Sequence, residues 1–404
     1  MPEAVIVSTA RSPIGRANKG SLKDMRPDDL TATIVQAALA KIPELDPKQI
    51  DDLYLGCGLP GGESGFNMAR IVSVLMGFDH LPGATITRYC SSSVQTTRMA
   101  FHAIKAGEGD VFVSAGVETV SRFGNGTSDV PGTQNPAFGD VMSRTTQTAQ
   151  GGVDWHDPRE DGTLPDAYIA MGQTAENVAR LRGLSRQELD EFGVRSQNLA
   201  EKAIDAGFWA REITPVTTPD GTEVSKDDGP RAGVTLEGVS DLKPVFRPDG
   251  VVTAGNCCAL NDGAAAVVVM SDTKARELGL TPLARIVSTG VTALSPEIMG
   301  LGPVEASKQA LARANMTIDD IDLVEINEAF AAQVVPSYQD LGIDIDRLNV
   351  NGGAIAVGHP FGMTGARLQN TMVNSLDWHD KSTGLITMCV GGGQGMALIL
   401  ERMS

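Results

Sequence analysis

Apolar positions recur in strand-like and helix-like patterns at both ends of the chain, but not in the middle. In residues 1–120 and 275–404, short apolar runs alternate with helical segments, as in an α/β protein whose sheets are buried. Residues 121–165 are instead rich in Gly, Pro, Thr, Asn and Asp and show little periodicity. A loop of this length inside a compact protein usually serves function or assembly. We therefore predict two α/β parts separated by a loop that serves function or assembly.

Two helices are predicted after this loop, and the second has the clearer boundaries. Ser185 is followed three residues later by Glu188, which is the pattern of a capping box, and Gly207 follows the last turn. The apolar residues of this helix fall near one face: Leu189, Phe192, Leu199 and Ala203.

The two ends of the chain also resemble each other in sequence. Residues 50–56, IDDLYLG, are echoed by residues 321–327, IDLVEIN, at an offset of 271. With that offset, Cys90 falls two residues from the position of His359, and a predicted helix follows each of them. If a pseudo-twofold axis relates the halves, Cys90 and His359 lie at equivalent helix N-termini and face one another. The two predicted helices span residues 92–105 and 362–375.

The charge balance limits the partners of the chain. Lys and Arg total 33 against 50 Asp and Glu, which gives a net charge of −17. Such a chain repels phosphate backbones, so we expect no nucleic-acid partner, and an anionic substrate needs a local basic patch. No apolar stretch approaches the length of a bilayer span, and the N-terminus does not resemble a signal peptide. We therefore expect no membrane insertion and a cytoplasmic location.

The cysteines fit neither a disulfide framework nor a structural zinc site, because their number is odd and no CxxC pair is present. They are Cys57, Cys90, Cys257, Cys258 and Cys389. We therefore expect a reducing compartment, and a catalytic cysteine has to be recognised from its local surroundings.

Cys90 and His359 are the main candidates for chemistry. Cys90 precedes a helix start rich in small polar residues, where the helix dipole is expected to lower the pKa of the thiol and supply a thiolate. An inert buried cysteine is the alternative. His359 lies in the glycine-rich segment 351–362, where a ligand can approach the ring and a base beside a thiol would activate it. A loop or capping histidine is the alternative there.

Three further segments combine a strand end with a turn or a polar residue. Cys389 ends an apolar strand and is followed by the turn VGGGQG. Because a second strand and not a helix follows, we interpret this segment as a tight turn that exposes backbone amides, and not as a nucleotide loop. A GxGxxG pattern at residues 56–61 contains Pro60, which removes an amide that a phosphate would need. Asn327 ends the second repeat's strand, at the edge where α/β sheets bind ligands, or it caps a helix.

Together these segments resemble the thiolase family over nearly the whole chain. No single motif is specific, but their order and spacing are. The motifs are Cys90-Ser91-Ser92, MGQTAEN at 171–177, NDGA at 261–264, MGLGP at 299–303, NEAF at 327–330, Gly358-His359-Pro360 and CVGGGQG at 389–395.

The resemblance implies a fold and a division into parts. The fold class is α/β, the thiolase fold: a duplicated α/β core in five layers, αβαβα, with an inserted loop domain. Residues 1–120 with 251–275 would form the N-terminal half of the core, and residues 276–404 the C-terminal half. Residues 121–250 would form the inserted domain, used for CoA binding and assembly. Family members are dimers or tetramers, so a homodimer or homotetramer is expected.

The resemblance also implies a role for each candidate residue. Cys90 would carry the acyl group, His359 would activate its thiol, and Cys389 would transfer protons at the departing acetyl-CoA. Oxyanions would be held by His359 with a water on Asn327, and by the backbone amides of Cys90 and Gly391. Acyl-CoA and CoA are the expected substrates, with no metal and no tightly bound cofactor.

The same resemblance assigns CoA binding to Arg231, Cys258, Met171 and Ala254. Two departures from the family pattern stand out: Ser93 replaces a usual Gly, and Cys258 replaces a hydroxyl residue with a weaker hydrogen-bond donor. The residue before Met171 is not the His that marks biosynthetic acetoacetyl-CoA thiolases. We therefore expect a 3-ketoacyl-CoA thiolase of the degradative type, as in fatty-acid β-oxidation. Such an enzyme cleaves 3-ketoacyl-CoA with CoA or catalyses the reverse reaction, a Claisen condensation.

Other functions share some of these features. A biosynthetic acetoacetyl-CoA thiolase and a non-catalytic homologue that binds acyl-CoA or lipid remain alternatives. A papain-like protease is disfavoured, because Cys90 lacks the flanking Gly and Trp of that signature and a second catalytic cysteine has no use there. A decarboxylating ketoacyl synthase shares the core fold but typically uses two histidines, and only His359 is well placed.

Overall fold

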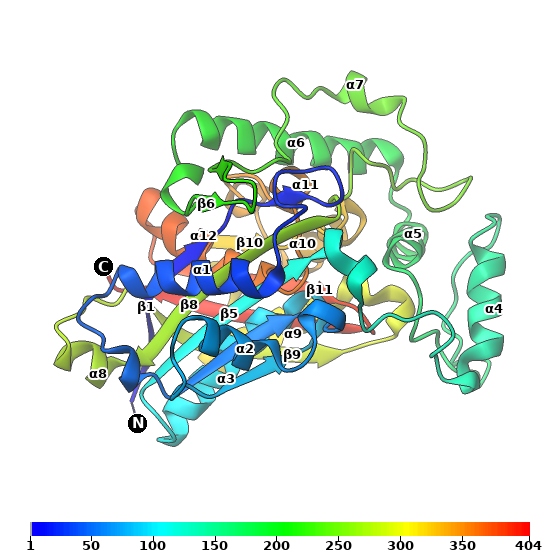
Figure 1. The fold of residues 1–404 in the computed structure, drawn as a ribbon. Helices are drawn as coiled ribbons and strands as arrows, with labels where there is room; N and C mark the ends of the chain where they lie inside the picture. The colour runs from blue at the N-terminus through cyan, green and yellow to red at the C-terminus, as the bar shows by residue number, and fades with distance from the viewer. Residues whose placement is uncertain (1) are drawn as a thin grey trace.

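The computed structural model describes residues 2–404, and across that range one large sheet runs through the molecule (Figure 1). Its strands follow the order β10-β11-β12-β9-β1-β8-β5-β3-β4, with the short β2 paired to β8. The strands are β1 Ala4–Arg11, β2 Gly15–Arg16, β3 Asp52–Cys57, β4 Gly83–Ile86, β5 Val111–Thr119, β8 Asn261–Ser271, β9 Ala284–Ala293, β10 Leu323–Ile326, β11 Thr383–Val390 and β12 Gln394–Arg402; β6 Val216–Thr217 and β7 Glu223–Val224 form a separate pair.

The helices alternate with these strands in both core segments of the chain. They are α1 Pro27–Ala40, α2 Met68–Leu75, α3 Ser92–Ala106, α4 Gly139–Thr148, α5 Met171–Arg182, α6 Arg186–Asp205, α7 Leu236–Ser240, α8 Asp272–Glu277, α9 Gly302–Ala314, α10 Ala331–Leu341, α11 Ala354–Val357 and α12 Thr364–Trp378. The predicted helices at 92–105 and 362–375 are confirmed as α3 and α12, with the second starting two residues later. No helix within residues 2–404 is long and apolar enough to cross a membrane.

The strand pairing shows that the core is duplicated. In the first half β3 runs parallel to β5, and β8 pairs antiparallel with β5 and with β1. In the second half β10 runs parallel to β11, and β12 pairs antiparallel with β11 and with β9. The halves join where β1 pairs antiparallel with β9. The repeat seen in residues 50–56 and 321–327 therefore corresponds to the equivalent strands β3 and β10.

Alternating side chains of the buried strands divide the core into layers. In β8, Ala265, Val267 and Val269 belong to the central apolar cluster that contains residues of α3 and α12, whereas Ala264, Ala266 and Val268 belong to the cluster under α1. A third cluster lies under α9 and α10 on the other half. The order is thus helices, half-sheet, α3 with α12, half-sheet, helices, which confirms the expected αβαβα arrangement.

The segment between β5 and β8 leaves the core and returns to it. Residues 121–165 were expected to lack periodic structure, but they contain the helix α4. Only Val141 of this helix is buried, so the helix needs no apolar face and its sequence shows almost no helical periodicity. Figure 1 shows α4 projecting at one side of the molecule. The capping box of Ser185 and Glu188 is confirmed at the start of α6.

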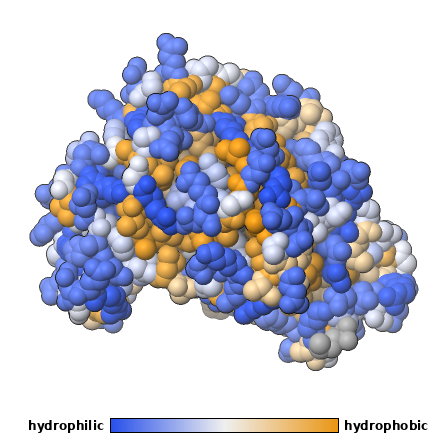
Figure 2. All heavy atoms as spheres, turned by 180° about the vertical axis from the view of Figure 1, so that it is seen from behind, coloured by the Kyte–Doolittle hydropathy of each residue, from blue (hydrophilic) through white to orange (hydrophobic). Residues whose placement is uncertain are grey.

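The surface carries both hydrophilic and apolar regions. Figure 2 shows hydrophilic side chains over much of the face seen from behind, with apolar side chains gathered among them. Among large apolar residues, Phe66 is 93% exposed, and Val74 and Leu75 of α2 are about half exposed. Contiguous apolar area left on a surface is a common feature of protein interfaces.

Arg11, at the end of β1, links the core to the segment between β5 and β8, which is called the inserted segment below. Its guanidinium is fully buried, and it donates to Glu212 at 2.5 Å and to both carboxylate oxygens of Asp227 at 2.7 and 2.9 Å. Asp227 also accepts from the backbone N–H of Ile14 at 2.8 Å. One arginine therefore neutralises two carboxylates that folding has removed from water.

Replacing Arg11 by Leu should destabilise the protein strongly, because two buried carboxylates would lose their counter-charge. We expect a loss of about 3–5 kcal/mol, measured as a lower urea midpoint of unfolding. Arg26→Leu is the matched control, since Arg26 pairs with Asp28 and Glu63 but its side chain is 44% exposed, and it should cost less than about 1 kcal/mol. Equal effects of the two substitutions would contradict the anchoring role of Arg11.

Candidate active site

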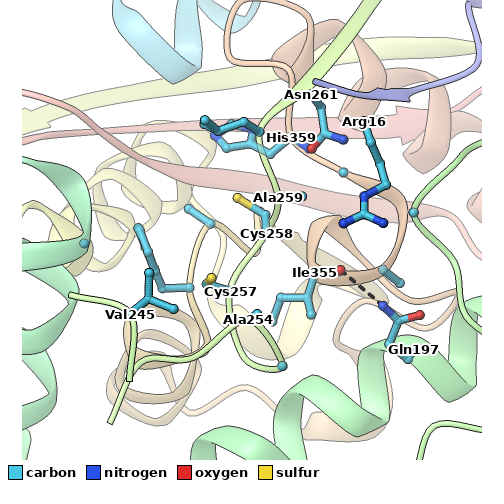
Figure 3. A pocket seen from close by; sticks show the side chains of 18 of the residues that line it. Arg16, Gln197, Val245, Ala254, Cys257, Cys258, Ala259, Asn261, Ile355 and His359 are labelled. Atoms are coloured by element: carbon cyan, nitrogen blue, oxygen red, sulfur yellow. Dashed lines mark hydrogen bonds between the residues drawn. The ribbon is translucent and has the colours of Figure 1, made fainter. Parts of the chain in front are cut away.

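One cavity of about 820 Å³ lies between the core and the inserted segment (Figure 3). Seven of the nine residues predicted for catalysis or CoA binding line it: Cys90, His359, Cys389, Arg231, Cys258, Met171 and Ala254. The rest of the lining is largely apolar and includes Phe246, Phe330 and Met299. A concave apolar site with a few convergent polar groups is typical of a substrate pocket.

Cys90 lies in a short 3-10 turn, Tyr89–Ser91, directly before α3. Tyr89 adopts a left-handed backbone conformation with φ of 44°, which is strained for a residue with a side chain. The backbone N–H of Gly391 donates to the Cys90 thiol, as does the N–H of Cys90 itself. The turn after β11 therefore brings the predicted amide of Gly391 to the sulfur, although Gly391 does not line the cavity wall.

The prediction that the helix start lowers the pKa of Cys90 is wrong. The residue is only 8% exposed, and burial raises the pKa of its thiol to about 12, which outweighs the two N–H groups. No cation contributes to the shift. Cys90 is therefore a protonated thiol at neutral pH in the free protein.

His359 is held by polar groups on several sides. Its backbone N–H donates to Oδ1 of Asn261 at 2.9 Å, and Nδ1 lies 2.6 Å from the hydroxyl of Thr364. Because that hydroxyl donates to the carbonyl of Pro360 at 2.7 Å, it accepts from Nδ1–H, which leaves Nε2 as the free base. Thr364 thus sets the tautomer that a thiol-activating base needs.

Asn327 follows β10 and lies against this imidazole. Its Nδ2 is 3.3 Å from Nε2 and 3.4 Å from Nδ1 of His359, nearly equidistant from both ring nitrogens. Its Oδ1 is buried and has no hydrogen-bond partner among residues 2–404. The alternative that Asn327 caps a helix is wrong, because α10 begins only at Ala331 and its N-cap is Phe330.

Burial makes the ring neutral and the second thiol protonated. The pKa of His359 falls to about 3, chiefly through burial and next through the positive charge of Arg367. Burial and then the neighbouring Cys90 raise the pKa of Cys389, which lies in β11 with no exposed surface. Two neutral thiols and one neutral imidazole therefore share the floor of the cavity.

The residues predicted to bind CoA lie on the walls. Arg231 is exposed, and its backbone N–H donates to Oε1 of Gln197 at 2.9 Å. Met171 is the first residue of α5, and Cys258 donates its backbone N–H to the carbonyl of Ala329 at 3.1 Å. Figure 3 shows Cys258, Ala254 and His359 around one space.

The buried Ser93 has a structural partner. Its Oγ accepts the N–H of Ala366, in the first turn of α12, at 2.9 Å. The N-cap position of α12, Met363, offers no side-chain acceptor, so Ser93 of α3 supplies one from the neighbouring helix.

Sequence reasoning missed several residues that hold the site. Asn261 and Thr364 lie within or beside quoted motifs, but only the structure shows that they fix His359. Glu118 explains why the GxGxxG segment is no phosphate loop: its buried carboxylate accepts the N–H groups of Gly58 and Gly362 at 2.7 and 2.8 Å. Arg16 also lines the cavity, and no motif in the sequence marks it.

Comparisons with known proteins agree over the whole chain. Residues 4–273 match the family model "Thiolase, N-terminal domain" and residues 280–402 match "Thiolase, C-terminal domain". The chain is 42% identical to a 3-ketoacyl-CoA thiolase of Idiomarina loihiensis, covering 100% of both chains, and 41% identical to one of Bacillus subtilis, covering 99% of this chain and 100% of that one.

Solved structures of similar proteins have the same fold. The Bacillus anthracis acetyl-CoA acetyltransferase superposes with a TM-score of 0.86 at 38% identity, over 100% of this chain and 99% of that one. Human mitochondrial 3-ketoacyl-CoA thiolase gives 0.87 at 34% identity, with the same coverage. The dimeric peroxisomal thiolase of Saccharomyces cerevisiae gives 0.89 at 33% identity, over 99% and 98%.

The shifted pKa values predict how Cys90 reacts with iodoacetamide in the free protein. With the thiol pKa at about 12 and the His359 pKa at about 3, neither group changes charge between pH 5 and 10, and the thiolate fraction grows steadily with pH. The alkylation rate, followed by intact mass, should keep rising through pH 9. A plateau reached near pH 7 would mean a thiolate–imidazolium pair and would contradict the neutral state.

Proposed function

The chain belongs to the thiolase family and is an acyltransferase, and on that basis we propose that it cleaves 3-ketoacyl-CoA with CoA. The products are acetyl-CoA and an acyl-CoA shorter by two carbons, and the reverse reaction is a Claisen condensation. CoA acts as a co-substrate and is not tightly bound. The observation that carries the proposal is the convergence of Cys90, His359 and Cys389 in one apolar cavity.

The first half-reaction uses the imidazole and one thiol. Nε2 of His359 takes the proton of Cys90 as the sulfur attacks the 3-keto carbon, so the thiolate forms only when the substrate is present. The bond between C2 and C3 then breaks and leaves the acyl group on Cys90. The departing acetyl-CoA enolate takes the proton of Cys389, which the raised pKa keeps available at neutral pH.

The second half-reaction regenerates the protein. The Cys389 thiolate takes the proton of an incoming CoA thiol, whose sulfur attacks the acyl group on Cys90. The shortened acyl-CoA leaves, and the proton on His359 returns to the Cys90 sulfur. Each of the three residues thereby returns to the protonation state that it had before the reaction.

Two sets of donors would hold the negative charge that develops on thioester oxygens. The N–H groups of Gly391 and Cys90 both donate to the Cys90 sulfur, and the oxygen of an acyl group bound to that sulfur would lie beside them. On the other side, the unpaired buried Oδ1 of Asn327 supports a water held between this residue and the substrate, next to His359.

The names of the similar bacterial proteins and the residue before Met171 support the degradative type, in fatty-acid β-oxidation. The similarity to an acetyl-CoA acetyltransferase keeps the biosynthetic reaction as the second candidate. We also propose a homo-oligomer, supported by the exposed Phe66, Val74 and Leu75 and by the dimeric yeast structure. The cytoplasmic location stays a prediction.

A thiolysis assay across 3-ketoacyl-CoA lengths tests the proposal. Chains longer than acetoacetyl-CoA should be cleaved at least as well as acetoacetyl-CoA itself. A steep preference for the four-carbon substrate would favour the biosynthetic type. Absence of turnover, with acyl-CoA bound but no acyl group found on the protein by mass spectrometry, would favour a non-catalytic homologue.

The two thiols should fail differently when they are replaced. With Cys389→Ala, acetylation of Cys90 by acetyl-CoA should remain detectable as a protein mass, while deuterium exchange into the acetyl methyl group should be lost. With Cys90→Ala, no acylated protein should form. His359→Ala should impair both reactions. Loss of acylation with intact exchange in Cys389→Ala would require the two cysteine roles to be exchanged.

A further inference from the structure

The turn that carries Cys90 is held by polar contacts around Arg88. The backbone N–H of Arg88 donates to Oγ of Ser92 at 2.9 Å, and that hydroxyl donates to the carbonyl of Tyr89 at 2.6 Å. The left-handed backbone of Tyr89 persists only where surrounding contacts impose it. The Arg88 side chain adds such a contact, because its Nε donates to Oε1 of Gln95 in α3 at 3.1 Å.

Residues 391–393 form the facing turn between β11 and β12, and all three are glycines. The second and third of them have left-handed backbones with φ of 76° and 78°. Glycines have no side chains that could fix a turn, so its position depends on contacts from neighbouring residues. Gln394, the first residue of β12, makes one of these contacts: its Nε2 donates to the carbonyl of Gly391 at 3.4 Å. The backbone N–H of the same glycine donates to the Cys90 sulfur.

A side-chain hydrogen bond joins these two turns. Nη1 of Arg88 donates to Oε1 of Gln394 at 2.6 Å, so the guanidinium links Gln95 of α3 to the turn after β11. Both acceptors are uncharged amides, whereas a carboxylate in either place would bring a negative charge near Cys90, where an oxyanion has to develop. Neither Arg88 nor Gln394 is among the residues that line the cavity. Any effect that they have on the reaction is therefore exerted through the two turns.

We propose that Arg88 and Gln394 are positioning residues, which hold the N–H of Gly391 against the Cys90 sulfur and so fix the oxyanion donors for an acyl group on that sulfur. This rests on the proposed function, because the acyl group is the species that these donors would serve. Donors stabilise an oxyanion best when they are already aimed at the place where the charge develops. A hydrogen bond from a charged guanidinium is stronger than one between neutral groups, which suits a link to a turn made of glycines.

The Arg88–Gln394 link predicts a selective defect, because it reaches one of the two sets of oxyanion donors. Acyl transfer onto Cys90 places negative charge beside the N–H of Gly391. The enolate of acetyl-CoA forms instead at Cys389, and the donors proposed for it are on the side of His359. Loss of the link should therefore slow acylation and leave proton exchange at the acetyl group intact.

Arg88→Met tests the link by two rates, both measured on the full-length protein with acetyl-CoA. Acetylation of Cys90, followed by quenched-flow mass spectrometry, should slow by about 10- to 100-fold, somewhat less than when an oxyanion donor is removed outright. Deuterium exchange into the acetyl methyl group should stay nearly unchanged. In thiolysis, kcat should fall while KM for the acyl-CoA stays nearly the same. Arg88→Lys should recover part of the acetylation rate, since it keeps a charged donor without the planar fork.

Gln394→Met removes the other end of the link and should give the same selective defect. If the two residues act through one hydrogen bond, the double variant should be no slower than the slower single variant. Arg98→Met is the matched control, because Arg98 lies in α3, is partly buried like Arg88, and its Nε has no hydrogen-bond partner among residues 2–404. This variant loses the same charge and should keep both rates. Thermal unfolding of each variant checks that the fold is retained.

Four results would overturn the link: unchanged acetylation in Arg88→Met, equal slowing of acetylation and exchange, losses that multiply in the double variant, or the same selective loss in Arg98→Met. Equal slowing would make Arg88 a purely structural residue, and a loss in the control would indicate a general effect of positive charge. An unaltered protein that is acetylated on Cys90, with variants that show any of these results, refutes the link alone. Absence of acetylation and exchange in the unaltered protein refutes the proposed function, and the link with it.

Discussion

Close packing of the first turns of α3 and α12 is the constraint on which the site depends. A side chain at Gly365 would overlap the backbone nitrogen of Val94, and one at Gly362 would overlap the carbonyl oxygen of Val117. Because both positions lack a Cβ, α12 begins directly against α3 and β5. The segments that precede these two helices therefore open into the same cavity, so that duplicated elements bring a thiol and an imidazole together.

The same packing determines the charge state of the site. Excluding water disfavours the ions of both groups, so the proton stays on the sulfur of Cys90 and the ring of His359 stays neutral. Separating these charges becomes favourable only when an electrophilic carbon and oxyanion donors are in place. A neutral resting pair also protects the nucleophile, because a thiol is far less reactive than a thiolate towards oxidants and alkylating agents.

The α/β class, the internal repeat and the candidates Cys90 and His359 could be predicted from the residues because their signals are local or repeated, whereas the five-layer fold and the role of each site residue came from the resemblance to the thiolase family. The strand repeat, the capping box at Ser185 and the helix after Cys90 each reflect a short stretch of chain. The pKa of Cys90 was predicted with the wrong sign, since the helix dipole is a local effect whereas burial comes from the whole fold. Arg16 was missed for the same reason, because only the folded chain places it on the cavity wall. The helix α4 escaped prediction because it buries almost nothing.

The position of β1 in the sheet has a consequence for biosynthesis. Among the described strands, β1 at residues 4–11 is synthesised first, yet it lies at the centre of the sheet between β8 and β9, which begin at residues 261 and 284. At roughly 5–20 residues per second, its two neighbours follow only after about 13–60 s of translation. During that interval an apolar strand with both edges unpaired is exposed on the nascent chain, which makes it a natural segment for a chaperone to shield and places the chain among slowly folding, non-local topologies.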